Sequence, residues 1–242
     1  MRQIFIATLL TLSTFSLRAQ ASVEAVAQTQ HFEFHINYWF NMHHFLWTEA
    51  FLNVHADSSL VVGQLSSEER AALNAAVNFY KENLVGQDLR SGDYMGAFRE
   101  WIIEQRINIR EIPDNFSVHM KHLLTFDGVY RTQFWSMQRN ACEVVLSENL
   151  ELIKTTEQAY VSEIEKLTRQ RWQGDPIRVD ITYFGKISKR NMRNRPYTNI
   201  FPTHVVMNTL GDNDIKGGWL ELLYHEAAHH LILGSSYFVS GT

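Results

Sequence analysis

The stretch that decides the fold and the chemistry is residues 218–234, which read GWLELLYHEAAHHLILG. Within it, His225-Glu226-Ala227-Ala228-His229 forms the pattern H-E-x-x-H. Residues four apart on a helix lie on one face, with Cβ atoms about 5–6 Å apart. Two imidazoles at this spacing can ligate one Zn²⁺ ion through their ring nitrogens. The motif therefore predicts His225 and His229 as metal ligands.

Glu226 directly follows the first histidine, so it borders the metal position without having to be a ligand. From there its carboxylate can accept a proton from a water molecule that zinc activates. We therefore predict Glu226 as the catalytic general base. Glu221 lies one turn before His225 and is either a hydrogen-bond acceptor that orients this histidine or a simple exposed residue near the start of the helix.

The flanking residues predict that the motif lies on a buried helix. No helix breaker occurs from 219 to 233, and Gly234 stands where a glycine commonly ends a helix. Apolar residues surround this helix on nearly all sides. Polar side chains in such a setting need partners, and one metal ion would satisfy both histidines and the glutamate. The alternative is a core helix in which the histidines bond to backbone carbonyls and Glu226 reaches solvent.

With His225, Glu226 and His229, and with the helices and strands that precede them, the chain resembles the zincin metallopeptidases, and among these the gluzincins. The resemblance implies a Zn²⁺ cofactor, a peptide or protein substrate and hydrolysis of a peptide bond. It also implies a third zinc ligand, a glutamate on a later helix. No carboxylate lies between His229 and Thr242. We therefore expect the third ligand to lie beyond Thr242 and the sequence to be truncated.

In zincins, the edge strand beside the metal helix binds an extended peptide by strand addition. The strand predicted at residues 203–208 is the candidate for this role, because its free N–H and C=O groups would align a substrate.

The first 21 residues have the character of a signal peptide. Arg2 provides a short positive region, residues 4–17 are mostly apolar, and Ala19-Gln20-Ala21 is a suitable cleavage site. We therefore expect an exported protein, periplasmic or extracellular. No later segment approaches 18 consecutive apolar residues, so a membrane span is not expected.

Composition narrows the remaining possibilities. The formal net charge is −4, and this mildly acidic balance argues against a nucleic-acid partner. Cys142 is the single cysteine, so no disulfide within the chain is possible, and its helical surroundings predict a buried thiol. The chain has no G-x-S-x-G elbow, glycine-rich phosphate loop or C-x-x-C pair.

The pattern of elements predicts an α+β, mainly helical protein, with several helices followed by a small sheet and a buried active-site helix. We expect a single zincin-like domain over residues 22–242, with a mainly helical part (22–173) and a part with strands and the H-E-x-x-H helix (174–242). Helices are predicted at 38–54, 66–86, 93–109 and 116–172, the last broken near Gly128 and with a second candidate break at Ser147. Strands are predicted at 31–36, 177–184 and 203–208.

Four histidines lie outside the motif on predicted helices. His43 and His44 are expected to bond to neighbouring carbonyls, and the alternative is that one of them reaches the metal cleft. His119 and His122 are expected on the surface, because no carboxylate or cysteine frames them.

The segment 186–195, KISKRNMRNR, is strongly basic. We interpret it as a solvated hairpin arm in preference to a site for an acidic substrate.

Taken together, the sequence predicts a zinc-dependent hydrolase, a peptidase with Glu226 as its base. The competing hypothesis is a non-catalytic exported helical protein that binds a partner or uses a metal only for structure.

Overall fold

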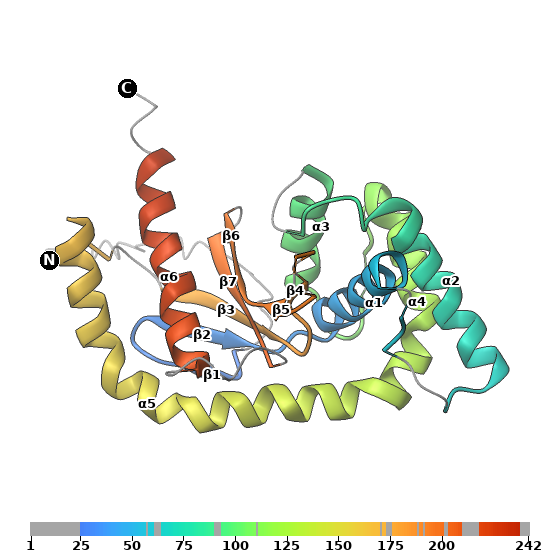
Figure 1. Ribbon diagram of the computed structural model, residues 1–242, viewed down its shortest axis with the longest axis horizontal. Coiled ribbons are helices and arrows are strands. Elements are labelled where there is room, and N and C mark those ends of the chain that lie inside the picture. The colour runs from blue at the N-terminus through green and yellow to red at the C-terminus, as the bar shows by residue number, and fades with distance from the viewer. Residues whose placement is uncertain are drawn as a thin grey trace, which may run out of the picture.

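The computed structural model describes residues 25–56, 58–60, 64–89, 93–109, 111–169, 171–172, 176–187, 189–190, 192–200, 203–209 and 218–237. The protein is α+β and mainly helical, which confirms the predicted fold class (Figure 1). The expected signal peptide, residues 1–21, lies outside the described residues. None of the described helices is long and apolar enough to cross a membrane.

The helices begin and end close to the predicted positions, with two exceptions. The third helix stops at Ile103 instead of continuing to 109, and the long helix is unbroken at Ser147. Near Gly128 the expected interruption takes the form of a π-helical turn that joins two α-helices. The helices are α1 (Tyr38–His55), α2 (Ser67–Asn83), α3 (Asp93–Ile103), η1 (Asp114–Phe116), α4 (Ser117–Tyr130), the π-helix η2 (Arg131–Trp135) and α5 (Ser136–Thr168).

The start of α2 shows how local chemistry fixes a helix boundary. The side chain of Ser66 accepts a hydrogen bond from the backbone N–H of Glu69, at 3.2 Å. In return, the Glu69 carboxylate accepts one from the backbone N–H of Ser66, at 2.8 Å. This reciprocal capping box satisfies two N–H groups that the helix leaves unpaired, as the sequence predicts.

A five-stranded mixed sheet lies between the helices and has the strand order β1-β2-β3-β7-β6. Strands β2, β3 and β7 are parallel, whereas β1 and β6 are antiparallel to their neighbours. The first two strands come from the amino-terminal part of the chain, so the sheet joins the two predicted parts. The strands are β1 (Ala27–Gln28), β2 (Phe32–His35), β3 (Ile177–Thr182), β6 (Tyr197–Ile200) and β7 (Thr203–Asn208), and a separate hairpin is formed by β4 (Lys186–Ile187) and β5 (Asn194–Arg195).

The topology corrects the predicted substrate strand. Residues 203–208 form β7 as expected, but β7 lies inside the sheet, between β3 and β6. Its backbone pairs with neighbours on both sides, for example Val205 with Val179 and with Thr198. The prediction that β7 is a free edge is therefore wrong, and the edge strand on this side of the sheet is β6.

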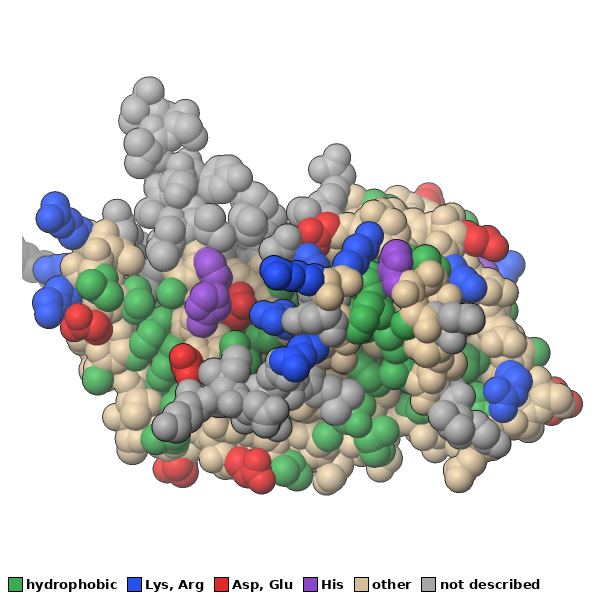
Figure 2. Space-filling view, viewed as in Figure 1, with side chains coloured by type: hydrophobic (Ala, Val, Ile, Leu, Met, Phe, Trp, Pro, Cys, Tyr) green, Lys and Arg blue, Asp and Glu red, His purple; other side chains and the backbone are tan. Residues whose placement is uncertain are grey.

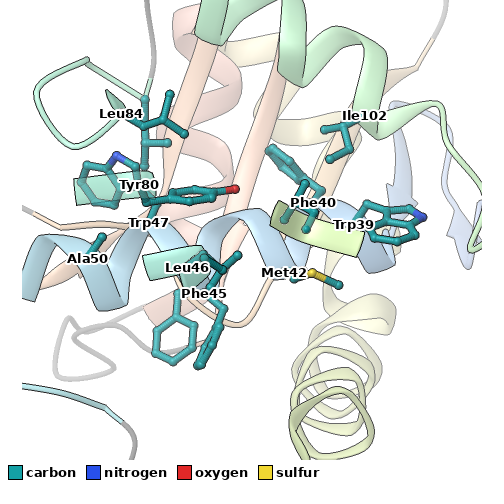
Figure 3. Packing of buried hydrophobic residues seen from close by; sticks show 14 of the residues in the cluster. Trp39, Phe40, Met42, Phe45, Leu46, Trp47, Ala50, Tyr80, Leu84 and Ile102 are labelled. Atoms are coloured by element: carbon teal, nitrogen blue, oxygen red, sulfur yellow. The ribbon is translucent and has the colours of Figure 1, made fainter. Parts of the chain in front are cut away.

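The larger hydrophobic core surrounds α1, and this helix is buried on all of its sides. Every residue from Tyr38 to Phe51 is buried. Figure 3 shows side chains of α1 pointing in several directions, toward Tyr80 and Leu84 at one end and Ile102 at the other. Because α2, α3 and α4 enclose α1, its polar residues must find partners inside the core.

The buried histidines find these partners in tyrosine hydroxyls. Tyr80 Oη lies 2.9 Å from His43 Nδ1 and 2.8 Å from His119 Nε2. His44 Nε2 lies 3.1 Å from Tyr197 Oη. A hydroxyl therefore replaces the predicted carbonyl partner of His43, whereas His44 contacts a hydroxyl and also the backbone of Phe184. The prediction that His119 lies on the surface is wrong, because α4 packs it against α2.

Burial keeps these imidazoles neutral. It lowers the pKa of His44 and of His119 to about 3, since a charged ring in the core would lose its hydration. His122 is only half-buried and stacks on Phe79, with 4.3 Å between ring centroids. Cys142 is fully buried, as predicted, and burial raises the pKa of its thiol to about 12.

The hairpin β4–β5 is held against the sheet by a tight approach at Gly185. A Cβ atom at this position would overlap the carbonyl oxygen of Arg195 and approach Asn208 Oδ1 to 2.7 Å. The Gly185 N–H also donates a hydrogen bond to Asn194 Oδ1, at 3.1 Å. Only glycine therefore allows the two strands and β7 to come this close.

We expect Gly185→Ala to lower the free energy of unfolding by about 1–3 kcal/mol, because the added methyl group forces the hairpin away from β7. Urea denaturation followed by circular dichroism measures the change. Gly128→Ala is the matched control, since this helical glycine has open space around its Cβ position and alanine there should stabilise by about 0.5–1 kcal/mol. Equal stability of Gly185→Ala and the wild type would contradict the tight approach.

Candidate metal and catalytic site

The H-E-x-x-H motif lies on α6 (Gly218–Tyr237), which packs across the sheet beside α5 (Figure 1). The helix buries Trp219, Leu223 and Ala227 against a second hydrophobic core formed by the sheet and α5. It continues through Gly234 to Tyr237, so the prediction that this glycine ends the helix is wrong.

The opposite face of α6 is open, which corrects a second prediction. His225 is exposed, and Glu226 and His229 are half-buried. The expectation of a helix that is buried all round is therefore wrong, because the sheet and α5 cover only one side. An exposed histidine can bond to water, so burial alone does not require a metal here.

Two sets of contacts fix the rotation of α6 about its axis. The Tyr224 hydroxyl lies 2.6 Å from Thr156 Oγ1 on α5, and the Tyr224 ring stacks on Tyr160 with 4.1 Å between centroids. The Tyr160 hydroxyl also donates to the backbone carbonyl of Tyr224. Near the start of the helix, Trp219 Nε1 donates to the carbonyl of Asn208 on β7, at 3.2 Å. These contacts keep the histidine face turned away from the core.

The two histidines converge on one point. His225 Nε2 and His229 Nε2 lie 3.2 Å apart, and their rings are nearly perpendicular, at 88°. Zinc–nitrogen bonds of about 2.0–2.1 Å at a tetrahedral angle place two nitrogens about 3.3–3.4 Å apart. The pair therefore has the donor atoms and the separation that a shared Zn²⁺ ion needs. A hydrogen bond from one ring N–H to the other ring nitrogen has the same length.

The described residues supply two ligands and no third. No group of three or more His, Cys, Asp or Glu side chains in the described part of the chain is placed to hold a metal ion. Glu221 and His225 are both described and exposed, and no hydrogen bond joins them, so Glu221 does not orient this histidine. The side chain of His230 lies outside the described residues.

Glu226 is held by a residue that the sequence did not identify. Thr198 Oγ1 on the edge strand β6 lies 2.7 Å from Glu226 Oε2 and also 2.7 Å from the backbone carbonyl oxygen of Glu226. The single hydroxyl proton can be donated to only one of these at a time. No other described residue donates to the carboxylate, which leaves Oε1 available to a ligand. No sequence signal marks Thr198, because its role depends on how β6 packs against α6.

Glu226 and His229 border a cleft of about 800 Å³. Residues of β6, of the hairpin β4–β5, of α1 and of the segment after α2 also line this cleft. Figure 2 shows histidine and acidic side chains over α6 beside a group of Lys and Arg side chains over the hairpin. The lining residues include Trp47, Phe51, Val85, Asp88, Leu89, Lys186, Ile187, Lys189, Arg195, Tyr197 and Thr198.

Part of the basic segment 186–195 borders the cleft. Strands β4 and β5 form a hairpin, as predicted, and Lys189, Arg190, Arg193 and Arg195 are exposed to solvent, as expected. Lys186, Lys189 and Arg195 also line the cleft. Neither His43 nor His44 is among the lining residues; both are enclosed in the α1 core.

Comparisons with protein-family models, with curated proteins and with solved structures found no match for this chain.

Proposed function

We propose that the protein is an exported zinc-dependent hydrolase that cleaves peptide bonds. The proposal is supported mainly by the 3.2 Å separation of the ring nitrogens of His225 and His229, together with the position of His229 and Glu226 in the lining of a large cleft. This separation fits a shared Zn²⁺ ion, and Glu226 follows the first histidine as the zincin motif requires. The resemblance of the motif to the zincin peptidases supports the same assignment.

The two histidines, Glu226 and Thr198 have different roles in the proposed reaction. A Zn²⁺ ion held by the two imidazoles would lower the pKa of a bound water molecule to about 7 and polarise a carbonyl oxygen. Glu226 accepts the proton of the attacking water through its unpaired Oε1 and later delivers it to the amine nitrogen of the departing peptide. Thr198 keeps the carboxylate in place through its hydrogen bond to Oε2. The proposal places the third zinc ligand outside the described residues.

The substrate strand of the proposal is β6 and not β7. One side of β6 pairs with β7, and no strand of the described sheet pairs with its other side. An extended peptide can bond to the free N–H and C=O groups of this edge. Because Thr198 lies on β6 and contacts Glu226, a peptide added to this edge passes directly beside the general base.

Metal removal tests the proposal. We expect the purified full chain to hydrolyse a mixture of unstructured peptides when it carries zinc, to lose this activity on dialysis against a chelator, and to recover it with one equivalent of Zn²⁺. Mass spectrometry of the products identifies the cleaved bonds.

Cys142→Ser is the matched control, since this buried thiol lies away from the cleft and its variant should respond to the chelator like the wild type. Hydrolysis that survives complete zinc removal would contradict the proposal, and a zinc-loaded chain that cleaves nothing would favour the non-catalytic alternative.

A further inference from the structure

We infer that the cleft selects peptides with acidic side chains, which bind to the basic hairpin β4–β5 on one side of the bond to be cleaved. The inference rests on the proposed function and names the substrate class of the same site. Its basis is the placement of Lys189 and Arg195 along the cleft that also contains Glu226 and His229.

The hairpin carries more positive charge toward the cleft than its neighbours neutralise. Lys186 Nζ lies 2.9 Å from Asp88 Oδ1, so this pair is balanced. Lys189 and Arg195 are exposed, and neither makes an ion pair with a described residue. The whole chain has a net charge of −4, so this group of cations is a local feature and not a consequence of a basic composition.

Strand pairing brings Lys186 and Arg195 onto one face of the hairpin. Lys186 is directly opposite Arg195 in the antiparallel pair, and directly opposite residues project from the same face. Because Asp88 balances Lys186, Arg195 and Lys189 are the cations with which an acidic side chain can pair. Pairing of this kind is the complementarity expected of an acidic ligand.

The hairpin is also packed against the body of the protein. Ile187 is buried, and the close approach at Gly185 places β5 against β7. Lys186 and Arg195 therefore extend from strands that are held in place. An acidic ligand that binds them costs these residues little conformational freedom.

The distance along the chain predicts where the acidic residue lies. Arg195 on β5 precedes Thr198 on β6 by three residues, and an extended chain rises about 3.3 Å per residue, so about 10 Å of chain separates Arg195 from Thr198, the residue that contacts Glu226. A peptide added to β6 with its scissile bond beside Glu226 would place a side chain two or three residues away over the hairpin. We therefore expect acidic residues at this separation, on one side of the cleaved bond.

Peptide binding to the Glu226→Gln full chain tests the inference without turnover. Three fluorescent peptide series of equal length carry Glu, Gln or Lys at each position in turn, and fluorescence anisotropy at low ionic strength gives the dissociation constants. We expect Glu peptides to bind about 3–10-fold more tightly than Gln peptides at one or two positions, and Lys peptides to bind less tightly.

The variant Lys189→Glu with Arg195→Glu should reverse this order. Lys121→Gln, which removes an exposed cation on α4, should leave it unchanged.

Peptide binding tests the inference, and peptide hydrolysis tests the proposed function separately. Equal affinity for Glu and Gln peptides, or the same order in the charge-reversed variant, would overturn the inference even if the wild type hydrolyses all three series. Selective binding of Glu peptides that depends on Lys189 and Arg195 would support the inference even if the wild type hydrolyses none of them, and the proposed function would then be wrong.

Discussion

Replacing Glu226 with glutamine should lower peptide hydrolysis by about 10²–10⁴-fold while zinc binding stays unchanged, because the amide cannot accept the proton of the attacking water. The substitution preserves the shape of the side chain. Its amide oxygen can still accept the hydrogen bond from Thr198, which lies 2.7 Å from Oε2 in the wild type. The geometry of the helix and of the cleft should therefore survive. The measurement is kcat/KM on the best cleaved peptide, with zinc content determined on the same samples.

Glu221→Gln is the matched control, since Glu221 lies on the same helix, is exposed and does not bond to His225. We expect this variant to retain wild-type activity. Full activity of Glu226→Gln would contradict the role of Glu226 and remove the peptidase assignment. Equal losses in the two variants would mean that the effect comes from charge on the helix and not from the base.

The second large effect is expected at Asp180, whose carboxylate is fully buried in β3. Arg178 binds it with two hydrogen bonds, Nε to Oδ2 at 2.9 Å and Nη2 to Oδ1 at 3.0 Å. His204 Nε2 on β7 lies 3.6 Å from Oδ2. Burial by itself raises the pKa of Asp180, but the charge and hydrogen bonds of Arg178, together with His204 and His35, lower it by more, so the pKa of Asp180 lies below its ordinary value. Arg178 also bonds to Glu104, so the pair connects the sheet to the end of α3.

Asp180→Asn should lower the free energy of unfolding by about 3–5 kcal/mol, because it leaves the half-buried guanidinium of Arg178 without its main counter-charge. Urea denaturation at neutral pH measures the loss. Glu151→Gln on α5 breaks the exposed pair with Lys154 and should change stability by less than about 0.5 kcal/mol. A loss below about 1 kcal/mol for Asp180→Asn would show that the pair does not hold the sheet and α3 together.

The sequence predicted those features whose signals are local. The capping box at Ser66 and Glu69 defines the start of α2 without reference to the rest of the chain. The alternation of apolar residues from Ile177 onward identifies β3, and the spacing of His225 and His229 on a helix brings their nitrogens together. These features depend on residues within a few positions of one another.

Features that depend on packing between distant segments were missed. Strand β6 has four residues and follows a basic hairpin, so only its pairing with β7 distinguishes it from a loop. Because the sequence does not mark β6, it predicts β7 as the edge strand. The burial of His119 depends on Tyr80 of α2, and the open face of α6 depends on where the sheet and α5 end. Thr198 could not be identified because its contact with Glu226 joins two elements that are unrelated in sequence.

Zinc stoichiometry shows whether His225 and His229 hold one Zn²⁺ ion between their ring nitrogens. Equilibrium dialysis followed by elemental mass spectrometry gives the zinc bound per chain, and X-ray absorption gives the ligand distances. We expect one zinc per wild-type chain, with nitrogen ligands at about 2.0–2.1 Å. His225→Gln and His229→Gln should each show a large loss of bound zinc. The control His122→Gln should show no loss. Zinc binding of equal affinity in the double variant His225→Gln with His229→Gln would contradict this zinc site.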